Sequence, residues 1–419
     1  MTVKRNSTSW SNSIFLSKAS VVSNIFDATF FIWLFSEILL PHSTFSTLAL
    51  LLFSFVSFVI SIKKRILKSG LAVFCWFFFF TAFSFLLALS GETMSKTVSF
   101  KMIKTLLINS AFLFAFSCYV AQTDLKRFLH IFVISLSIVS LLGFLINFVK
   151  TSSINLREDT AFFNANFLAV LDAFAIIASI FCFKKANRML YIVSSIPLLL
   201  VIISSGARKA FLALALGLIL FFMVDKPSKI LRNCLVVLSI AALFCFAIFK
   251  IPVLYNKIGV RFESLFSLLS SGSGSSSENS RAYYIEVGFN AFKGKPFTGI
   301  GIDCFRLIPN SWGYPIDTYS HCNYIELLSG VGVIGFALYY CLHFISIILY
   351  VRHPKKLDPI IKFFLIVILI TTFLDVSMVS YFERVILILP VMCFSGLKNQ
   401  SFYQKNNVLL CLLKSLSLA

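Results

Sequence analysis

The sequence predicts an all-α polytopic membrane protein with about 12 transmembrane helices and one large extracytoplasmic loop that contains short helices. Hydrophobic residues make up 58% of the 419 residues, and Phe alone supplies 50. The mean hydropathy of +0.91 is far above that of a soluble domain. Windows of about 20 residues with few charges recur, each long enough to cross a hydrocarbon core of about 30 Å as a helix. Because these windows are continuously apolar, they predict bundled helices rather than the alternating strands of a barrel.

Apolar runs give the expected elements in chain order. Residues 1–20 are polar, and no small-residue cleavage site follows the first apolar run, so we expect an uncleaved cytoplasmic tail. The spans are expected at residues 22–40, 45–62, 70–90, 103–121, 128–149, 162–183, 190–205, 209–224, 230–250, 324–351, 359–376 and 382–397. The seventh and eighth are short and meet at the sequence SSGAR, where a single re-entrant hairpin is the alternative.

Positive charge predicts the orientation of the spans. Lys and Arg gather in alternate connections, around residues 63–68, 126–127, 184–188, 226–232 and 352–356. Such residues collect in cytoplasmic loops, and an even number of spans then places both termini in the cytoplasm. The loop at about 251–322 faces outward in this topology. The whole chain, 1–419, is predicted to be a single integral membrane domain.

The outward loop has three expected parts: a flexible linker, an amphipathic helix and a turn-rich segment at residues 295–301. Ser270 to Ser277 reads SSGSGSSS, the composition of a flexible linker. Arg281 then opens an amphipathic helix that ends at Gly294. Its apolar positions recur at helical spacing: Ile285, Phe289 and Phe292. We expect this helix to lie on the outer membrane surface, near lipid headgroups.

The net charge of +20 does not predict nucleic-acid binding. Cytoplasmic loops account for the basic residues, and no basic stripe carries interleaved surface aromatics. The ten Cys form no CxxC and no His/Cys cluster with metal spacing, so we expect no metal and no cofactor. Cys304 and Cys322 lie in the same outward loop, and a disulfide between them is left open.

His321 is the main candidate for acid–base chemistry. It precedes the sequence NYIE, in which Asn323 and Glu326 have the N-cap and N3 spacing of a capping box at the start of the tenth span. The positive end of a helix dipole disfavours imidazolium, so a neutral His321 that can accept a proton is expected. The alternative is a histidine that merely caps or packs at the interface.

Three outward arginines suit a diphosphate, because guanidinium groups match phosphate oxygens. They are Arg157, Arg208 and Arg281. Each one alone could instead anchor to lipid headgroups. Asp27 and Asp172 are intramembrane carboxylates without obvious partners in the sequence, and an ion pathway through them is a further alternative.

Four segments together resemble the O-antigen polymerase and ligase superfamily, the Wzy-type and WaaL-type enzymes. They read REDTAFFNANFLA, SSGARKAFLALALG, RAYYIEVGFNAFKGKPFTGIG and YSHCNYIELLSGVGVIG, and they cover about residues 155–335. Ala165 stands where the family often has Pro. Cys322 stands where a second Asn or Ser is common.

The resemblance implies a metal-independent membrane glycosyltransferase at the periplasmic face of the bacterial inner membrane. Its expected substrate is an undecaprenyl-diphosphate-linked oligosaccharide. The wording ARKAF and YSHCNYIELL is closer to polymerases, which move a growing glycan onto a lipid-linked repeat unit. The alternative is a ligase that moves glycan onto lipid A core. A lipid-linked oligosaccharide flippase or other transporter is a more distant alternative, since the sequence has no internal repeat and few intramembrane charges.

The resemblance also implies roles for individual residues. His321 would act as the general base on the acceptor hydroxyl, or orient it, and Arg208 and Arg281 would hold the diphosphate, with Arg157 as a third candidate. Four residues are expected to support the site: Tyr319, Asn323, Glu326 and Asn166. A chain-length regulator protein is a candidate partner.

Overall fold

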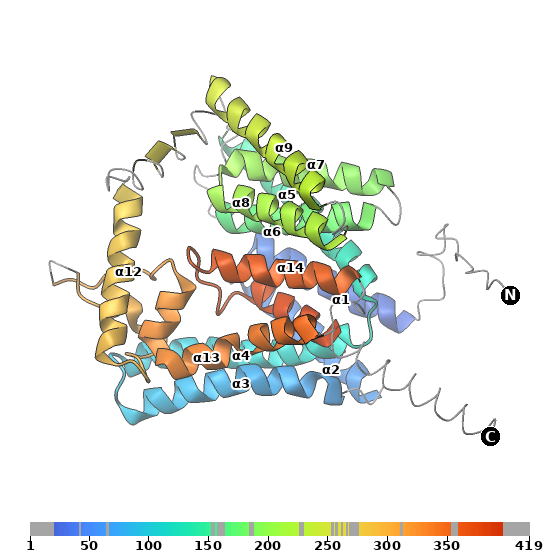
Figure 1. Ribbon diagram of the computed structural model, residues 1–419. Helices are drawn as coiled ribbons and strands as arrows, with labels where there is room; N and C mark the ends of the chain where they lie inside the picture. Colours follow the sequence, from blue (N-terminus) through green and yellow to red (C-terminus); the bar gives the residue numbers. More distant parts are fainter. Residues whose placement is uncertain are drawn as a thin grey trace, which may run out of the picture. The chain divides into compact units, whose positions relative to one another are not determined.

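The computed structural model describes residues 21–396 (Figure 1), apart from 42, 64–66, 152–155, 157–163, 184–187, 226–229, 253–254, 256–258, 261–262, 265–266, 268–275, 311–312 and 353–358. The described residues form helices and turns, with one isolated antiparallel bridge between Pro309 and Pro315. The main elements are α1 (Val21–Leu39), α2 (Thr44–Lys63), α3 (Leu67–Ser90), α4 (Lys96–Val120), α5 (Leu125–Thr151), α6 (Ala165–Phe183), α7 (Arg188–Ser205), α8 (Arg208–Asp225), α9 (Ile230–Lys250), α12 (Ser276–Gly294), η3 (Cys304–Leu307), α13 (Asn323–Arg352) and α14 (Pro359–Leu374). A further helix spans Arg384–Gly396.

Helices lie at each apolar stretch that the sequence marks, with shifted ends. The helix expected from residue 103 begins at Lys96, because the Ser95 side chain caps it by accepting from the Val98 N–H at 3.4 Å. Among the described residues, 5 helices are long and apolar enough to cross a membrane, namely those within α2, α3, α4, α5 and α13. Shorter apolar helices accompany them. The chain is therefore an all-α, multi-pass membrane protein.

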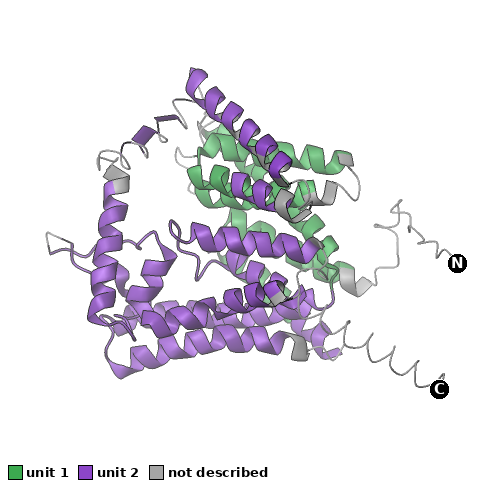
Figure 2. Ribbon diagram, in the orientation of Figure 1, with its two compact units in different colours: residues 1–56, 123–214 green, residues 57–122, 215–419 purple. Residues whose placement is uncertain are grey.

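The chain divides into two compact units (Figure 2). Unit 1 holds residues 1–56 and 123–214, and unit 2 holds residues 57–122 and 215–419. In unit 1, α5 packs against α1, α6 and α7. Phe30 lies at the α1–α5 contact, with its ring 5.6 Å from Trp33 and 5.3 Å from Phe128. Such aromatic contacts between helices hold this unit together.

Unit 1 supplies partners for both intramembrane carboxylates. Asp27 forms a salt bridge with Arg127, whose Nη2 also donates to Asn24 Oδ1 at 2.7 Å. Both oxygens of Asp172 accept from the Ser140 hydroxyl, at 2.8 and 2.9 Å. These partners come from α5, far from either carboxylate in the sequence, so no local pattern could have revealed them.

Unit 2 is organised around α13. This helix packs against α3, α12 and α14, and α3 runs along α4. The indole Nε1 of Trp76 on α3 donates to the backbone oxygens of Leu338 and Tyr339, both at 3.0 Å. The candidate site lies at the N-terminal end of α13.

The helix around Arg281 starts earlier than the sequence indicated. α12 begins at Ser276, so Ser276 and Ser277 belong to a helix and not to a linker. The first part of the Ser-rich tract, residues 270–275, lies outside the described residues. The predicted end at Gly294 is confirmed. Ile285 and Phe289 are exposed, at 39% and 43%, and contact with the membrane surface stays a prediction for them.

Candidate functional site

A backbone contact between the turn at residues 296–301 and α13 forms the foundation of the site. Three hydrogen bonds make this contact: Ile300 N–H to Ser329 O at 2.8 Å, Gly301 N–H to Gly330 O at 2.8 Å, and Val333 N–H to Pro296 O at 2.9 Å. Buried backbone groups need such partners. The turn is therefore fixed to the first turns of α13.

Glycine is required on both sides of this contact. Gly332 interrupts α13 with φ 64°, and a Cβ there would lie 2.3 Å from the Phe297 carbonyl group. Gly299 has φ 67°, and its Cβ would meet the backbone of Ser329 and Gly330 at 2.5 Å. Only glycine combines positive φ with so close an approach. The glycines of these two segments are therefore required for the packing of the turn against the helix.

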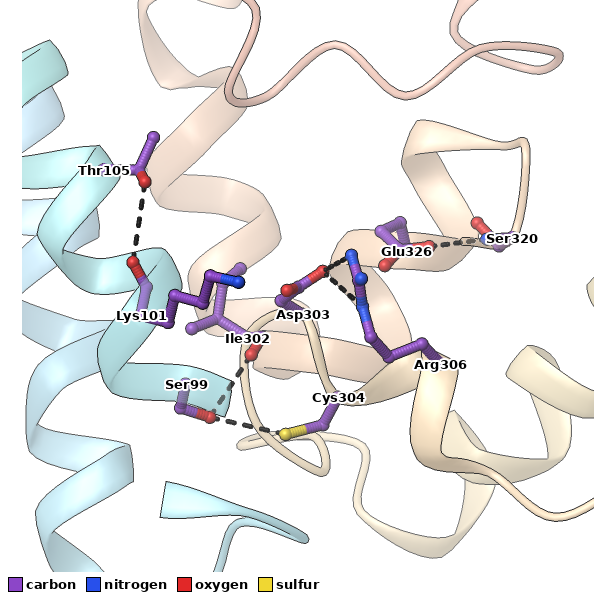
Figure 3. Close-up of polar contacts among 9 residues, drawn as sticks. All are labelled: Ser99, Lys101, Thr105, Ile302, Asp303, Cys304, Arg306, Ser320 and Glu326. Carbon is purple, nitrogen blue, oxygen red and sulfur yellow. Dashed lines mark hydrogen bonds and ion pairs between the residues drawn. The ribbon is translucent and has the colours of Figure 1, made fainter. Parts of the chain in front are cut away.

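An ion pair between Asp303 and Arg306 directly follows this turn (Figure 3). Asp303 has a left-handed backbone, φ 59°, and its Oδ1 accepts from Arg306 Nε at 3.2 Å and Nη2 at 2.7 Å. Burial raises the pKa of Asp303, while Arg306 and then Lys101 of α4 act in the opposite direction. Asp303 and Arg306 were not predicted as site residues from the sequence. Their position directly after the glycine turn is the feature that could have indicated them.

The backbone around His321 is held in an unusual conformation. His321 has φ 59°, which few residues other than glycine adopt. The preceding Ser320 N–H donates to Glu326 Oε2 at 2.7 Å (Figure 3). The Ser320 hydroxyl donates to Cys322 O at 2.8 Å and accepts from Cys322 N–H at 3.3 Å. These bonds hold the Tyr319–Ser320 peptide and the two peptides that flank Cys322, and so hold the backbone around His321.

Two tyrosine rings contact the imidazole of His321. The Tyr284 ring is nearly parallel to it, 19° between planes and 6.2 Å between centroids. The Tyr319 ring is tilted, with 4.4 Å between centroids. Arg281 stands three residues before Tyr284 on α12, so both project from one face of that helix.

The charge of Arg281 also affects the pKa of Tyr319. Burial raises the pKa of Tyr319, and nearby Glu383 raises it further, while the positive charge of Arg281 opposes the rise. The charge of Arg281 thus reaches Tyr319, whose ring contacts His321. The sequence prediction placed all three in one loop, and the structure brings α12 and the start of α13 against each other.

Asn323 differs from its predicted role. Its side-chain oxygen accepts from the backbone N–H groups of Ser380 and Tyr381, at 2.9 and 3.1 Å. Glu326 bonds to Ser320 and not to the Asn323 backbone, as a capping box would require. The capping-box prediction was therefore wrong, because a distant loop and the residue before His321 compete for these two side chains.

A buried carboxyl, Asp375, completes the contact between that loop and α13. It directly follows α14; its Oδ2 accepts from the Tyr340 hydroxyl at 2.6 Å and its Oδ1 from the Ser380 hydroxyl at 2.6 Å. The Asn323 amide donates to the same Tyr340 hydroxyl at 2.8 Å. The sequence showed only a lone acid at a span end.

The other predicted residues belong to unit 1 or lie outside the described residues, and the two cysteines of the outward loop were a separate question. Arg208 begins α8 and is half-buried, and it belongs to unit 1. Asn166, also in unit 1, is exposed at the start of α6, where its N–H donates to the Asn164 side chain at 3.1 Å. Arg157 lies outside the described residues. Cys304 and Cys322 are both free thiols.

Comparison with known families identifies the segment that carries this geometry. Residues 193–340 match the family model described as O-antigen ligase, Wzy_C. The matched residues include Arg281, the glycine turn, the His321 backbone clamp and the first half of α13. The match supports the resemblance of this segment to the O-antigen polymerase and ligase superfamily. The resemblance drawn from the sequence is confirmed, and Arg208 of unit 1 also falls within the matched residues. No curated protein matches the chain.

Proposed function

We propose that the chain is a glycan polymerase. It transfers a growing glycan from undecaprenyl diphosphate onto a lipid-linked repeat unit, at the periplasmic face of the bacterial inner membrane. One observation carries the proposal: inside the segment matched to the O-antigen superfamily, the helix that carries Arg281 places the Tyr284 ring against His321, whose backbone is constrained.

His321 is assigned the role of general base. As the acceptor hydroxyl oxygen bonds to the anomeric carbon of the donor, the imidazole takes the hydroxyl proton. A positioned base of this kind contributes about 10² to 10⁴ in rate. The hydrogen-bonded backbone around His321 supports this role, because a base must be held within hydrogen-bond reach of its proton.

Arg281 is assigned to the leaving group. The bond between the anomeric carbon and the diphosphate oxygen breaks, and negative charge develops on the lipid diphosphate. A guanidinium group offers two parallel donors to such oxygens, which supports Arg281 over a lysine at this place. The same role for Arg208 and Arg157 remains a prediction from the sequence. With arginine carrying this task, the reaction is proposed to need no metal.

A ligase is the second candidate, because the matched family model is itself described as O-antigen ligase. It would use the same donor and transfer the finished glycan to lipid A core. The His321 and Arg281 roles would be unchanged, since only the acceptor differs.

One gel separates the two activities. Lipopolysaccharide from a strain that lacks the gene is compared with that of the complemented strain. Core that carries a single repeat unit in the deletion strain supports the polymerase. Bare core, with polymer retained on the lipid carrier, supports the ligase. An unchanged ladder, with capsule and exopolysaccharide length also unchanged, would contradict both.

A further inference from the structure

We propose that Tyr284 is a positioning residue for His321 and that it couples the orientation of the imidazole to the helix that carries Arg281. The inference rests on the proposed function. It starts from the nearly parallel rings of Tyr284 and His321, 6.2 Å apart at their centroids. Offset stacking of this kind favours a defined ring orientation.

The backbone hydrogen bonds around His321 do not by themselves set the orientation of the imidazole ring. Hydrogen bonds of Glu326 and Ser320 hold the backbone before and after His321, and so restrain the direction of its Cα–Cβ bond. They do not set rotation about the side-chain bonds. Tyr284 from α12 and Tyr319 from the preceding loop supply the ring contacts. Backbone and ring are thus restrained by different elements.

α12 is seated so that its tyrosine reaches the histidine. Gly288 lies four residues after Tyr284 on the same helix face, and a Cβ there would lie 2.3 Å from Ile325 Cγ2 of α13. The Phe305 ring is 3.0 Å from the same position and contacts the Tyr284 ring edge-on, with centroids 6.3 Å apart. Close packing at Gly288 fixes how α12 meets α13.

Arg281, Tyr284 and Gly288 stand at positions i, i+3 and i+7 of α12, which form one helix face. The contact that brings Tyr284 to the imidazole therefore also sets where the Arg281 side chain starts. Loss of the Tyr284 ring should disturb the proton transfer more than substrate binding, because Tyr284 acts through His321.

The test uses purified full-length protein in liposomes with a lipid-diphosphate-linked oligosaccharide. Tyr284→Leu is expected to lower kcat by up to about 10²-fold, the cost of a small misplacement, with KM unchanged. It should also shift the limb of the kcat–pH profile that reports the protonation of His321. Tyr284→Phe keeps the ring and should retain most of the wild-type kcat and the wild-type profile. Phe289→Leu removes an exposed ring from the same helix and is the matched control.

Three kinetic outcomes would overturn the inference. One is wild-type kcat in Tyr284→Leu. Another is an equal loss in Tyr284→Phe, which would assign the effect to the hydroxyl group. The third is a rise in KM alone, which would make Tyr284 a substrate contact.

A second readout needs no activity. Diethyl pyrocarbonate modification of His321, followed by peptide mass spectrometry, should be faster in Tyr284→Leu than in wild type and unchanged in Phe289→Leu. Equal rates in all three proteins would contradict the ring contact. If wild-type protein transfers no glycan while these rates differ as expected, the proposed function fails and the contact stands.

Discussion

His321 shows how much the site depends on single residues. Its left-handed backbone costs on the order of 1 kcal/mol or more for a non-glycine residue, so surrounding contacts must hold it. Ser320 and Glu326 supply them. The sequence placed His321 and Glu326 near one helix start, and that was right. It could not show the conformation, because φ at a single position depends on which distant groups bind the neighbouring peptides.

Arg281 gives a prediction at this scale. Arg281→Lys keeps the charge but loses the planar pair of donors, so kcat/KM should fall by about tenfold, the equivalent of one lost charge-assisted hydrogen bond. In Arg281→Ala, kcat/KM should fall by about 10²- to 10³-fold. Lys293→Ala on the same helix is the control, and it should keep wild-type kinetics. Wild-type kcat/KM in Arg281→Ala would remove Arg281 from the site.

At the scale of elements, the glycine turn and α13 act as one structural piece. The sequence predicted a turn at residues 295–301 and a helix from about residue 324, and both are present. It did not predict that the two share backbone hydrogen bonds, because helix propensity gives no sign of the break at Gly332. Apolar periodicity located α12 but not its first residue. Serine has a middling helix propensity, so a Ser-rich tract does not show where a helix begins within it.

Gly332→Ala tests this contact. The added Cβ would lie 2.3 Å from backbone atoms at positive φ, so we expect a loss of folded protein and of activity together. Gly294→Ala is the matched control, since a Cβ there meets nothing within 4 Å. Fluorescence size-exclusion profiles of the detergent-solubilised proteins give the measurement. A monodisperse Gly332→Ala protein with wild-type Tm would contradict the packing argument.

At the scale of the whole molecule, composition predicted the class well, because a greasy chain has few folds open to it in lipid. Helices appear at the expected stretches, yet the partners of Asp27, Asp172 and Asp375 come from segments distant in sequence. Pairing between helices depends on packing that one-dimensional patterns do not encode. The division into two compact units was likewise not foreseen.

Orientation is a prediction for the whole chain. Lys- and Arg-rich connections should be cytoplasmic, so an alkaline phosphatase fusion after residue 275 should be active and one after residue 185 inactive. A cytoplasmic reporter should give the reverse pattern. Inactive alkaline phosphatase at residue 275, with active cytoplasmic reporter there, would place the candidate site on the wrong face of the membrane for lipid-linked glycan.

The central claim is that His321 acts as the base in glycan transfer. The most direct measurement is the length of glycan that purified protein makes in liposomes from undecaprenyl-diphosphate-linked repeat units. Wild type should give a ladder, and His321→Ala, folded to the same extent, should give single units only. A wild-type ladder from His321→Ala would contradict the account.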